Sequence, residues 1–142
     1  MKTSESKYRN CLYFTTNALA RKTEKLAQQS WKKVNLSPSH GYLLMLALEN
    51  PGIQPGMISD HLQLTPSTVT RLIEKLEQNK LLVRITEGKT SSVYPTSKAK
   101  ALMPKMMECV QEFSENYNQL LGKEEAEKMV QRIGKMADKI AE

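Results

Sequence analysis

Three prolines open closely spaced helices in the first half of the chain. Ser37-Pro38 and Thr65-Pro66 each combine a capping side chain with a proline at the first helical position, and Pro55 begins a shorter run between them. A helix that starts this way cannot start elsewhere without losing its cap. Since the last two of these helices are joined by a very short connection, the sequence predicts a tight helix-turn-helix.

The three predicted helices differ in how far they are buried. The run from Tyr42 to Leu48 is apolar on nearly every face, so the helix that Asn50-Pro51-Gly52 ends is expected at the centre of the domain. The short helix from Pro55 is expected to carry three apolar side chains inward, namely Met57, Ile58 and Leu62. The helix from Pro66 has one apolar stripe and an opposite face that is polar. The stripe consists of Val69, Leu72, Ile73 and Leu76.

A β-hairpin is predicted directly after these helices. The runs LLVRIT (81–86) and SSVYPT (91–96) are rich in β-branched and aromatic residues. Between them, Gly88 supplies the backbone freedom that a hairpin turn requires. A helix-turn-helix followed by a hairpin is a winged helix-turn-helix.

Long amphipathic helices flank this central part. Residues 4–34 are read as one helix, and Thr96 is read as the cap of another whose apolar positions recur every three or four residues. Pro104 is expected to kink or break that helix, and Gly122 is expected to end it before a last helix. The predicted fold is therefore mainly α with a small β-wing, organised as a winged helix-turn-helix between long terminal helices.

Composition narrows the class of protein. With 142 residues, 39% hydrophobic and 25% charged, the chain fits one soluble globular domain, 1–142. No stretch is long and apolar enough for a membrane span or a secretory signal, so a cytoplasmic location is expected. Cys11 and Cys109 fit neither a disulfide framework nor a zinc site. Since no phosphate loop, nucleophile elbow or metal motif appears, we expect no enzyme activity, no metal and no cofactor.

Charge is distributed unevenly along the chain. The formal net charge is +6, and residues 71–105 hold eight Lys or Arg against three Glu. Residues 106–142 reverse this balance, with eight acidic residues against five basic ones. A basic middle next to a helix-turn-helix indicates a polyanionic partner, and double-stranded DNA fits best.

The helix from Pro66 has the features of a recognition helix. Small hydroxyl side chains crowd its start, where they let the backbone approach a phosphate. Arg71, one turn in on the outer face, is predicted to read a base because its fork matches the acceptor pair of guanine. The full set of predicted DNA-binding residues is Thr65, Ser67, Thr68, Thr70, Arg71, Lys75, Arg84 and Lys89. Taken singly, Arg71, Lys75 and Lys89 are each equally consistent with an ordinary solvated surface charge.

The order of elements from Leu36 to Leu102 resembles the MarR family of winged-helix transcription regulators. The run from Ile58 to Leu82, followed by two wing strands and the Pro95-Thr96 start of the next helix, carries most of this resemblance. It implies a winged DNA-binding lobe at 36–98 and a helical dimerisation lobe made of 4–34 and 97–141. Where many family members have an Asp-x-Arg element at the wing tip, this chain has Glu-Gly-Lys-Thr-Ser (87–91), so Lys89 is expected to hold a phosphate only.

The resemblance also implies partners. Family members are two-fold dimers whose winged domains occupy successive major grooves, and ligands or oxidants usually weaken their DNA binding. Carried over, this predicts a homodimer that binds a pseudo-palindromic operator and represses transcription. The predicted dimer residues are Leu12, Leu19, Leu120, Val130 and Ile133.

What such a regulator would sense is left open by the sequence. Cys11, with Tyr8 and Tyr13 near it in a first helix, resembles the thiol of the peroxide-sensing branch of the family. A pocket for a small-molecule effector between the two lobes is the other reading, whereas Cys109 is expected to be structural. The alternative to specific DNA readout is a winged helix that docks protein partners.

Overall fold

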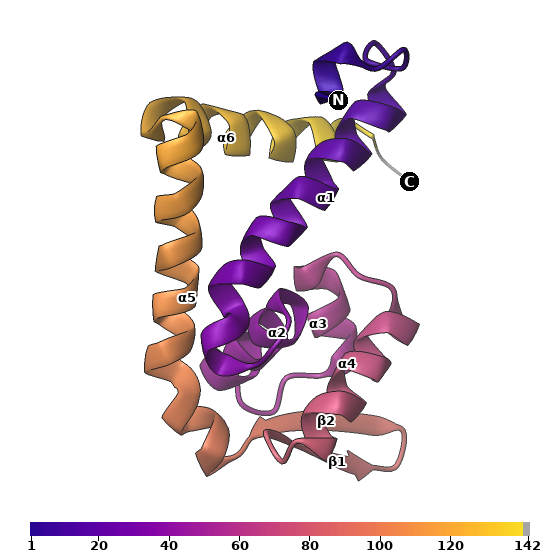
Figure 1. The fold of residues 1–142 in the computed structure, drawn as a ribbon. Coiled ribbons are helices and arrows are strands. Elements are labelled where there is room, and N and C mark those ends of the chain that lie inside the picture. The colour runs from indigo at the N-terminus through magenta and orange to yellow at the C-terminus, as the bar shows by residue number, and fades with distance from the viewer. Residues whose placement is uncertain (141–142) are drawn as a thin grey trace. The chain divides into compact units, whose positions relative to one another are not determined.

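The computed structural model describes residues 1–140. The chain forms two compact units, which we call the helical unit (Met1–Leu26 with Val110–Glu142) and the winged unit (Ala27–Cys109). Helices α1 (Leu12–Trp31) and α5 (Ser97–Leu121) each belong in part to both units. The fold is mainly helical with one β-hairpin, as predicted (Figure 1).

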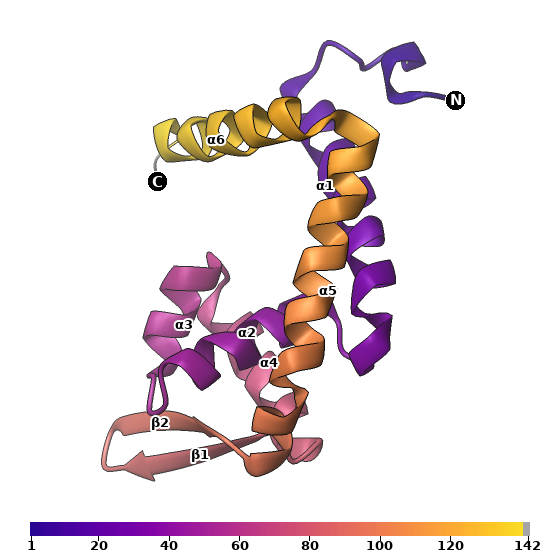
Figure 2. The same ribbon diagram turned by 90° about the vertical axis from the view of Figure 1, so that its left-hand side faces the viewer.

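The winged unit contains the predicted helix-turn-helix and wing. Along the chain it consists of α2 (Pro38–Glu49), α3 (Pro55–Leu62), α4 (Pro66–Gln78), β1 (Leu82–Glu87) and β2 (Thr90–Pro95), before α5 begins. Figure 2 shows the hairpin extending beyond the three short helices of this unit.

The predicted helix starts are confirmed. The Ser37 side chain accepts a hydrogen bond from the backbone N–H of His40, and the Thr65 side chain accepts one from Thr68. Thr96 caps α5 in the same way, since its Oγ1 accepts from the N–H of Ala99. Each cap satisfies an N–H that the helix itself leaves without a partner.

The core of the winged unit is built around α2. Leu43, Leu44 and Ala47 are fully buried, and the Trp31 ring lies against Gly41 so closely that no Cβ fits there. The other helices and the hairpin cover this centre with fully buried side chains, namely Ile58, Val69, Ile73, Leu76 and Val93. The prediction that Met57 points inward is wrong, because Met57 is 50% exposed and Ile58 alone in α3 is buried.

The hairpin has the predicted turn. Glu87 pairs with Thr90, so the turn has two residues, and Gly88 adopts a φ of 61° that residues with a side chain rarely take. On its other side β2 is tied to the helices by a bridge between Val93 and Ile53. The base of the hairpin is therefore part of the core, whereas its outer half is exposed.

The first long helix is shorter than expected, and of the two outcomes expected at Pro104, a kink or a break, the break is absent. Residues 4–34 do not form one helix: a 3₁₀ turn at Thr3–Glu5 precedes irregular turns, and α1 begins only at Leu12. The Ser6 side chain accepts a hydrogen bond from the N–H of Tyr8, a local bond that competes with helix formation. Pro104 does not break α5, which continues from Ser97 to Leu121. Pro104 is exposed, so water can satisfy the carbonyl that the proline leaves without a donor.

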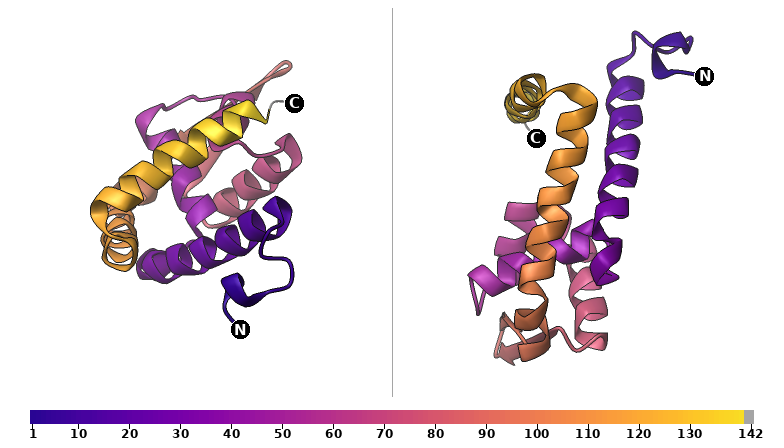
Figure 3. Two further views of the ribbon diagram at one scale, coloured as in Figure 1. Left: turned by 90° about the horizontal axis from the view of Figure 1, so that it is seen from above. Right: turned by 60° about the vertical axis from the view of Figure 1, so that its left-hand side comes forward.

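The helical unit has almost no core of its own. Gly122 follows the end of α5 and has a φ of 85°. The chain turns there, so α6 (Lys123–Lys139) points in a different direction from the end of α5 (Figure 3). Of the described residues of this unit, Ala126 is the only buried one. One face of α6 therefore exposes large apolar side chains, including Val130, Ile133 and Met136.

Candidate nucleic-acid interface

The turn between α3 and α4 is fixed by hydrogen bonds from Ser59. The backbone N–H of Leu64 donates to the carbonyl of Ser59, and the Ser59 hydroxyl donates to the carbonyl of Leu64. Gln63 takes a left-handed conformation, with a φ of 54°, and its side chain donates to the carbonyl of Asp60. The two helices of the helix-turn-helix are thus held by bonds that hydrophobic spacing does not predict.

Hydroxyl groups cluster at the start of α4, as the sequence suggested. Thr65 Oγ1 lies 2.8 Å from Thr68 Oγ1 and 3.3 Å from Ser67 Oγ. Thr70 is different, because its hydroxyl donates to the carbonyl of Pro66 within the same helix. Thr65, Ser67 and Thr68 therefore present a small polar surface at the N-terminal, positive end of the helix dipole, where a phosphate is attracted.

The outer face of α4 is open to solvent. Val69, Ile73 and Leu76 are fully buried on the inner side, and Arg71 is exposed on the other. Among the residues that the structure describes, none forms an ion pair with Arg71. Its five N–H donors are therefore available to a partner outside the chain.

Lys75 lies further along α4 and close to His40 of α2. Burial lowers the pKa of His40, and the nearby positive charge of Lys75 lowers it further. The His40 ring nitrogen Nδ1 is 2.5 Å from the Ser37 hydroxyl. Because His40 is thereby favoured in its neutral form, Lys75 supplies the positive charge at this end of α4.

The two basic residues predicted in the wing have different surroundings. Lys89 stands at the exposed tip, next to Gly88 in the turn. Arg84 reaches back to α4, where its Nη2 donates to Glu77 Oε1 at 2.8 Å. Arg84 therefore has an intramolecular partner, and a contact between Arg84 and DNA stays a prediction.

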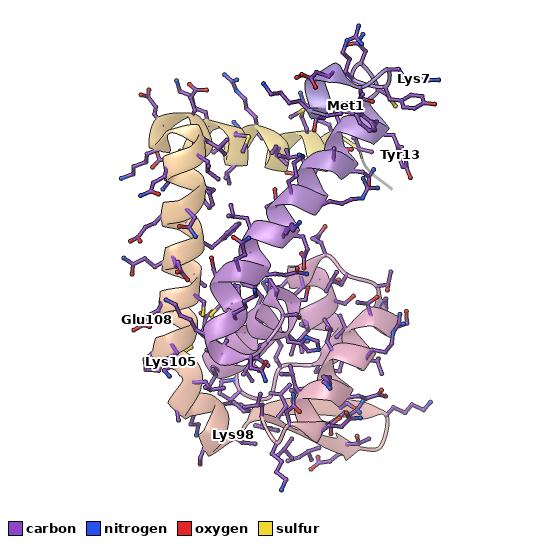
Figure 4. The ribbon with its side chains drawn as sticks, viewed as in Figure 1. Met1, Lys7, Tyr13, Lys98, Lys105 and Glu108 are labelled. Atoms are coloured by element: carbon purple, nitrogen blue, oxygen red, sulfur yellow. The ribbon has the colours of Figure 1, made fainter. Side chains whose placement is uncertain are left out.

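The predicted sensor residues surround the start of α1. Cys11 is exposed and precedes α1, so the expectation that it lies within the first helix is wrong. Tyr8 packs on Phe14, with ring centroids 6.0 Å apart, and Tyr13 is 77% exposed (Figure 4). Within residues 1–140 of one protomer, no hydrogen bond joins the Cys11 thiol to a tyrosine hydroxyl. Cys109, in contrast, is buried.

The predicted dimer residues are all exposed in the single chain. They lie in α1, at the end of α5 and along α6, and the largest exposed fraction is 73%, at Leu120. The set is Leu12, Leu19, Leu120, Val130 and Ile133. The structure of one protomer thus leaves these apolar side chains available to a partner.

Comparison with known proteins identifies the winged unit. Residues 34–90, which run from just before α2 to the tip of the wing, match the model of the MarR family. This part of the chain is similar to the MarR family. MarR proteins are DNA-binding transcription regulators with a winged helix-turn-helix, and the matched residues include the hydroxyl cluster and Arg71.

Solved structures of this fold cover nearly the whole chain. The MepR–DNA complex of Staphylococcus aureus is 20% identical, covers 92% of this chain and 98% of its own, and superposes with a TM-score of 0.78. CouR of Rhodococcus jostii RHA1 is 18% identical and covers 96% of this chain and 98% of its own. Its TM-score is 0.83 in the complex with p-coumaroyl-CoA and 0.82 in the complex with a 23-mer DNA duplex. At these identities the likeness concerns the fold. No curated protein matches.

Two further classes of site were sought among the described residues. No group of His, Cys, Asp and Glu there could hold a metal ion. None of the described helices combines the length and the apolar character needed to cross a membrane.

Sequence reasoning missed Glu77 as a residue that bears on the site. It lies in the last turn of α4, and its partner Arg84 is in β1 beyond a turn. Spacing rules for ion pairs apply within one helix or between paired strands, so a pair that crosses from a helix to the following strand has no sequence signature.

Proposed function

We propose that this protein is a homodimeric repressor of transcription of the MarR type that reads a pseudo-palindromic operator and is released by an effector. The observation that carries the proposal is the outer face of α4, where Arg71 is exposed, has no ion-pair partner in residues 1–140 and follows the hydroxyl cluster by one turn. A helix with these features fits the major groove, with Arg71 on a guanine and the hydroxyls on the backbone.

The wing adds a second contact in this proposal. Lys89, at the exposed tip, meets a phosphate beside the groove that α4 occupies. Lys75 and the hydroxyl groups at the start of α4 hold the DNA backbone on either side of Arg71. Arg71 thus supplies sequence preference, and the other contacts supply affinity that falls as the salt concentration rises.

Dimerisation follows from the lack of a core in the helical unit. An amphipathic helix such as α6 gains little stability in water unless its apolar face is covered. A second copy of the chain covers it with the same residues by two-fold symmetry, which matches an operator with two related half-sites. The exposed apolar residues of α1, α5 and α6 support this arrangement.

Two kinds of effector are consistent with the chain. Oxidation of Cys11 is supported by its exposure at the start of α1, beside the dimer residue Leu12. A small-molecule effector is supported by the similarity in fold to CouR, whose structure holds p-coumaroyl-CoA. Either effector would act by changing the relative positions of the two winged units in the dimer.

A mobility shift distinguishes these effectors. The duplex is an operator selected from a random pool, and the protein is used reduced, after peroxide treatment, and as the Cys11→Ser variant. Release by peroxide in the wild type together with retention in the variant establishes the thiol switch. If peroxide changes the binding of neither the wild type nor the variant, the thiol switch is contradicted. Small-molecule effectors are then sought by thermal shift.

Protein docking is the second candidate function, and one observation favours it. The outer face of the hairpin exposes Val83, Ile85 and Tyr94, which are paired or adjacent across the two strands. An exposed apolar surface of this kind is common in protein interfaces. If the random pool yields no enriched duplex, this function replaces operator binding.

A further inference from the structure

One ion pair connects the last turn of α4 to the wing. Arg84 Nη2 donates to Glu77 Oε1 at 2.8 Å, and the two side chains are 28% and 31% exposed. A charge-assisted hydrogen bond that is partly shielded from water is stronger and better oriented than an ion pair on the open surface. This ion pair is therefore able to fix the angle between α4 and the hairpin.

The turn between Glu77 and Arg84 is held by hydrogen bonds from the start of α5. Lys80 takes a left-handed conformation with a φ of 61°, and its carbonyl accepts from Thr96 Oγ1 at 2.8 Å. The carbonyl of Asn79 accepts from Lys98 Nζ at 3.0 Å. These bonds fix the turn after α4 but do not reach the strand beyond it. Among the described hairpin residues, Arg84 alone makes a side-chain hydrogen bond to α4.

The outer half of the hairpin has little other support. From Ile85 to Thr90 the residues are exposed, and the hairpin has only two strands beyond the bridge at Val93. Two-stranded ribbons are only marginally stable alone and vary in twist. The position of the tip relative to α4 thus depends on what anchors the hairpin at Arg84.

We propose that Glu77 and Arg84 are positioning residues for DNA binding. The pair holds the wing at the angle at which Lys89 reaches the backbone while Arg71 is in the groove. It also keeps the Arg84 guanidinium on α4 and away from phosphates. This inference rests on the proposed function, in which Arg71 and Lys89 contact the operator.

A double-mutant cycle between Glu77 and Lys89 tests the positioning role, because the Glu77–Arg84 ion pair does not include Lys89. Lys89→Ala in the wild type is expected to weaken operator binding about fivefold and to reduce the salt slope by about one. Glu77→Gln is expected to cause a similar loss. In the Glu77→Gln background, Lys89→Ala is then expected to have no further effect on affinity or salt slope, because the tip no longer reaches the DNA.

Three variants separate positioning from general effects. Arg71→Ala is expected to cost the same in both backgrounds, since α4 itself is intact. Glu74→Gln removes the same charge from the exposed face of α4, and Lys89→Ala is expected to keep its full effect there. The exchanged pair Glu77→Arg with Arg84→Glu is expected to restore the effect of Lys89→Ala. Circular dichroism melting confirms that each variant is folded.

The outcomes separate this inference from the proposed function. Additive losses for Glu77→Gln and Lys89→Ala overturn the positioning role and leave the wing contact standing. If Lys89→Ala has no effect in the wild type, the wing contact itself is contradicted, and so is the positioning role of Glu77 and Arg84.

Discussion

Arg71 is the single residue on which sequence recognition depends in this account. Its side chain is exposed, and no ion-pair partner competes for it among residues 1–140. The Arg71→Ala variant is expected to bind its operator about 1–3 kcal/mol more weakly and to lose base preference at one position in each half-site. Competition binding with single-base variants of the operator measures both. An equal loss on every sequence would show that Arg71 contacts only the backbone.

Gly41 is a residue whose role is packing. A Cβ at this position would lie 2.2 Å from Cζ3 of Trp31, and both residues are buried. The Gly41→Ala variant is expected to lose about 2 kcal/mol of unfolding free energy by overpacking. Urea denaturation measures it, with Gly56→Ala as the control because a Cβ there meets nothing within 4 Å. Equal stability of the two variants would contradict the packing described around Trp31.

His40 gives the winged unit a pH dependence. Burial and the charge of Lys75 lower the pKa of His40 from 6.5, so the unfolded chain binds the proton more readily. Stability is therefore full above about pH 6.5 and falls as the pH drops below it. Urea midpoints at about pH 7.5 and about pH 5.5 are expected to differ less in His40→Gln than in the wild type. His61→Gln, in an exposed position, serves as control, and an unchanged pH dependence in His40→Gln would refute the assignment.

The helix starts were predictable from single residues, and the ion pair was not. Ser37, Thr65 and Thr96 act within three residues of their own positions, so their pattern appears directly in the sequence. Glu77 and Arg84 meet only because a turn folds back between them. The general limit is that local hydrogen bonds have a sequence signature, whereas contacts made by tertiary folding do not.

At the scale of elements, the start of α4 combines stability with the proposed DNA contact. Thr65 caps the helix and orders the hydroxyl cluster. The Thr65→Ala variant is expected to lose about 1 kcal/mol of unfolding free energy. Thr70→Ala is the matched control, because the Thr70 hydroxyl only bonds within the helix and caps nothing. Chemical denaturation compares the two, and equal stability would argue against the cap.

Element boundaries show where hydrophobic periodicity misleads. Apolar residues at helical spacing continued back to Tyr8, yet α1 begins at Leu12 because Ser6 forms a local turn. In α5, Pro104 suggested a break, but the helix continues because Pro104 is exposed and water can bond to the carbonyl that lacks a donor. The wing was predictable because Gly88 and the two β-prone runs are a local sequence signature of a hairpin, which can be recognised without knowledge of its tertiary contacts. Periodicity thus locates an element better than it locates its ends.

At the scale of the whole molecule, the exposed apolar face of the helical unit makes the proposed dimer testable. Ile133 lies on the exposed apolar face of α6. The wild type is expected to have twice the chain mass of 16.1 kDa, and Ile133→Glu is expected to be monomeric, because a charge in an apolar interface is not solvated. Light scattering after size exclusion measures this. Gln131→Glu adds the same charge elsewhere on exposed α6 and is expected to stay dimeric. A dimeric Ile133→Glu would exclude this face of α6 from the interface.

The sequence predicted the class of molecule, but a single chain does not define the assembly. The apolar stripe of α6 was visible as a pattern, and the structure adds that one protomer leaves it uncovered. Which residues meet across a two-fold axis depends on the partner copy, and no local rule supplies that.

Selection of bound duplexes from a random pool is the decisive test of operator binding by a dimer. We expect an enriched pseudo-palindrome whose half-sites lie about 10 base pairs apart, with a guanine position that Arg71→Ala no longer selects. A pool that shows no enrichment, or only a single asymmetric half-site, would contradict a dimeric regulator that reads its operator through α4.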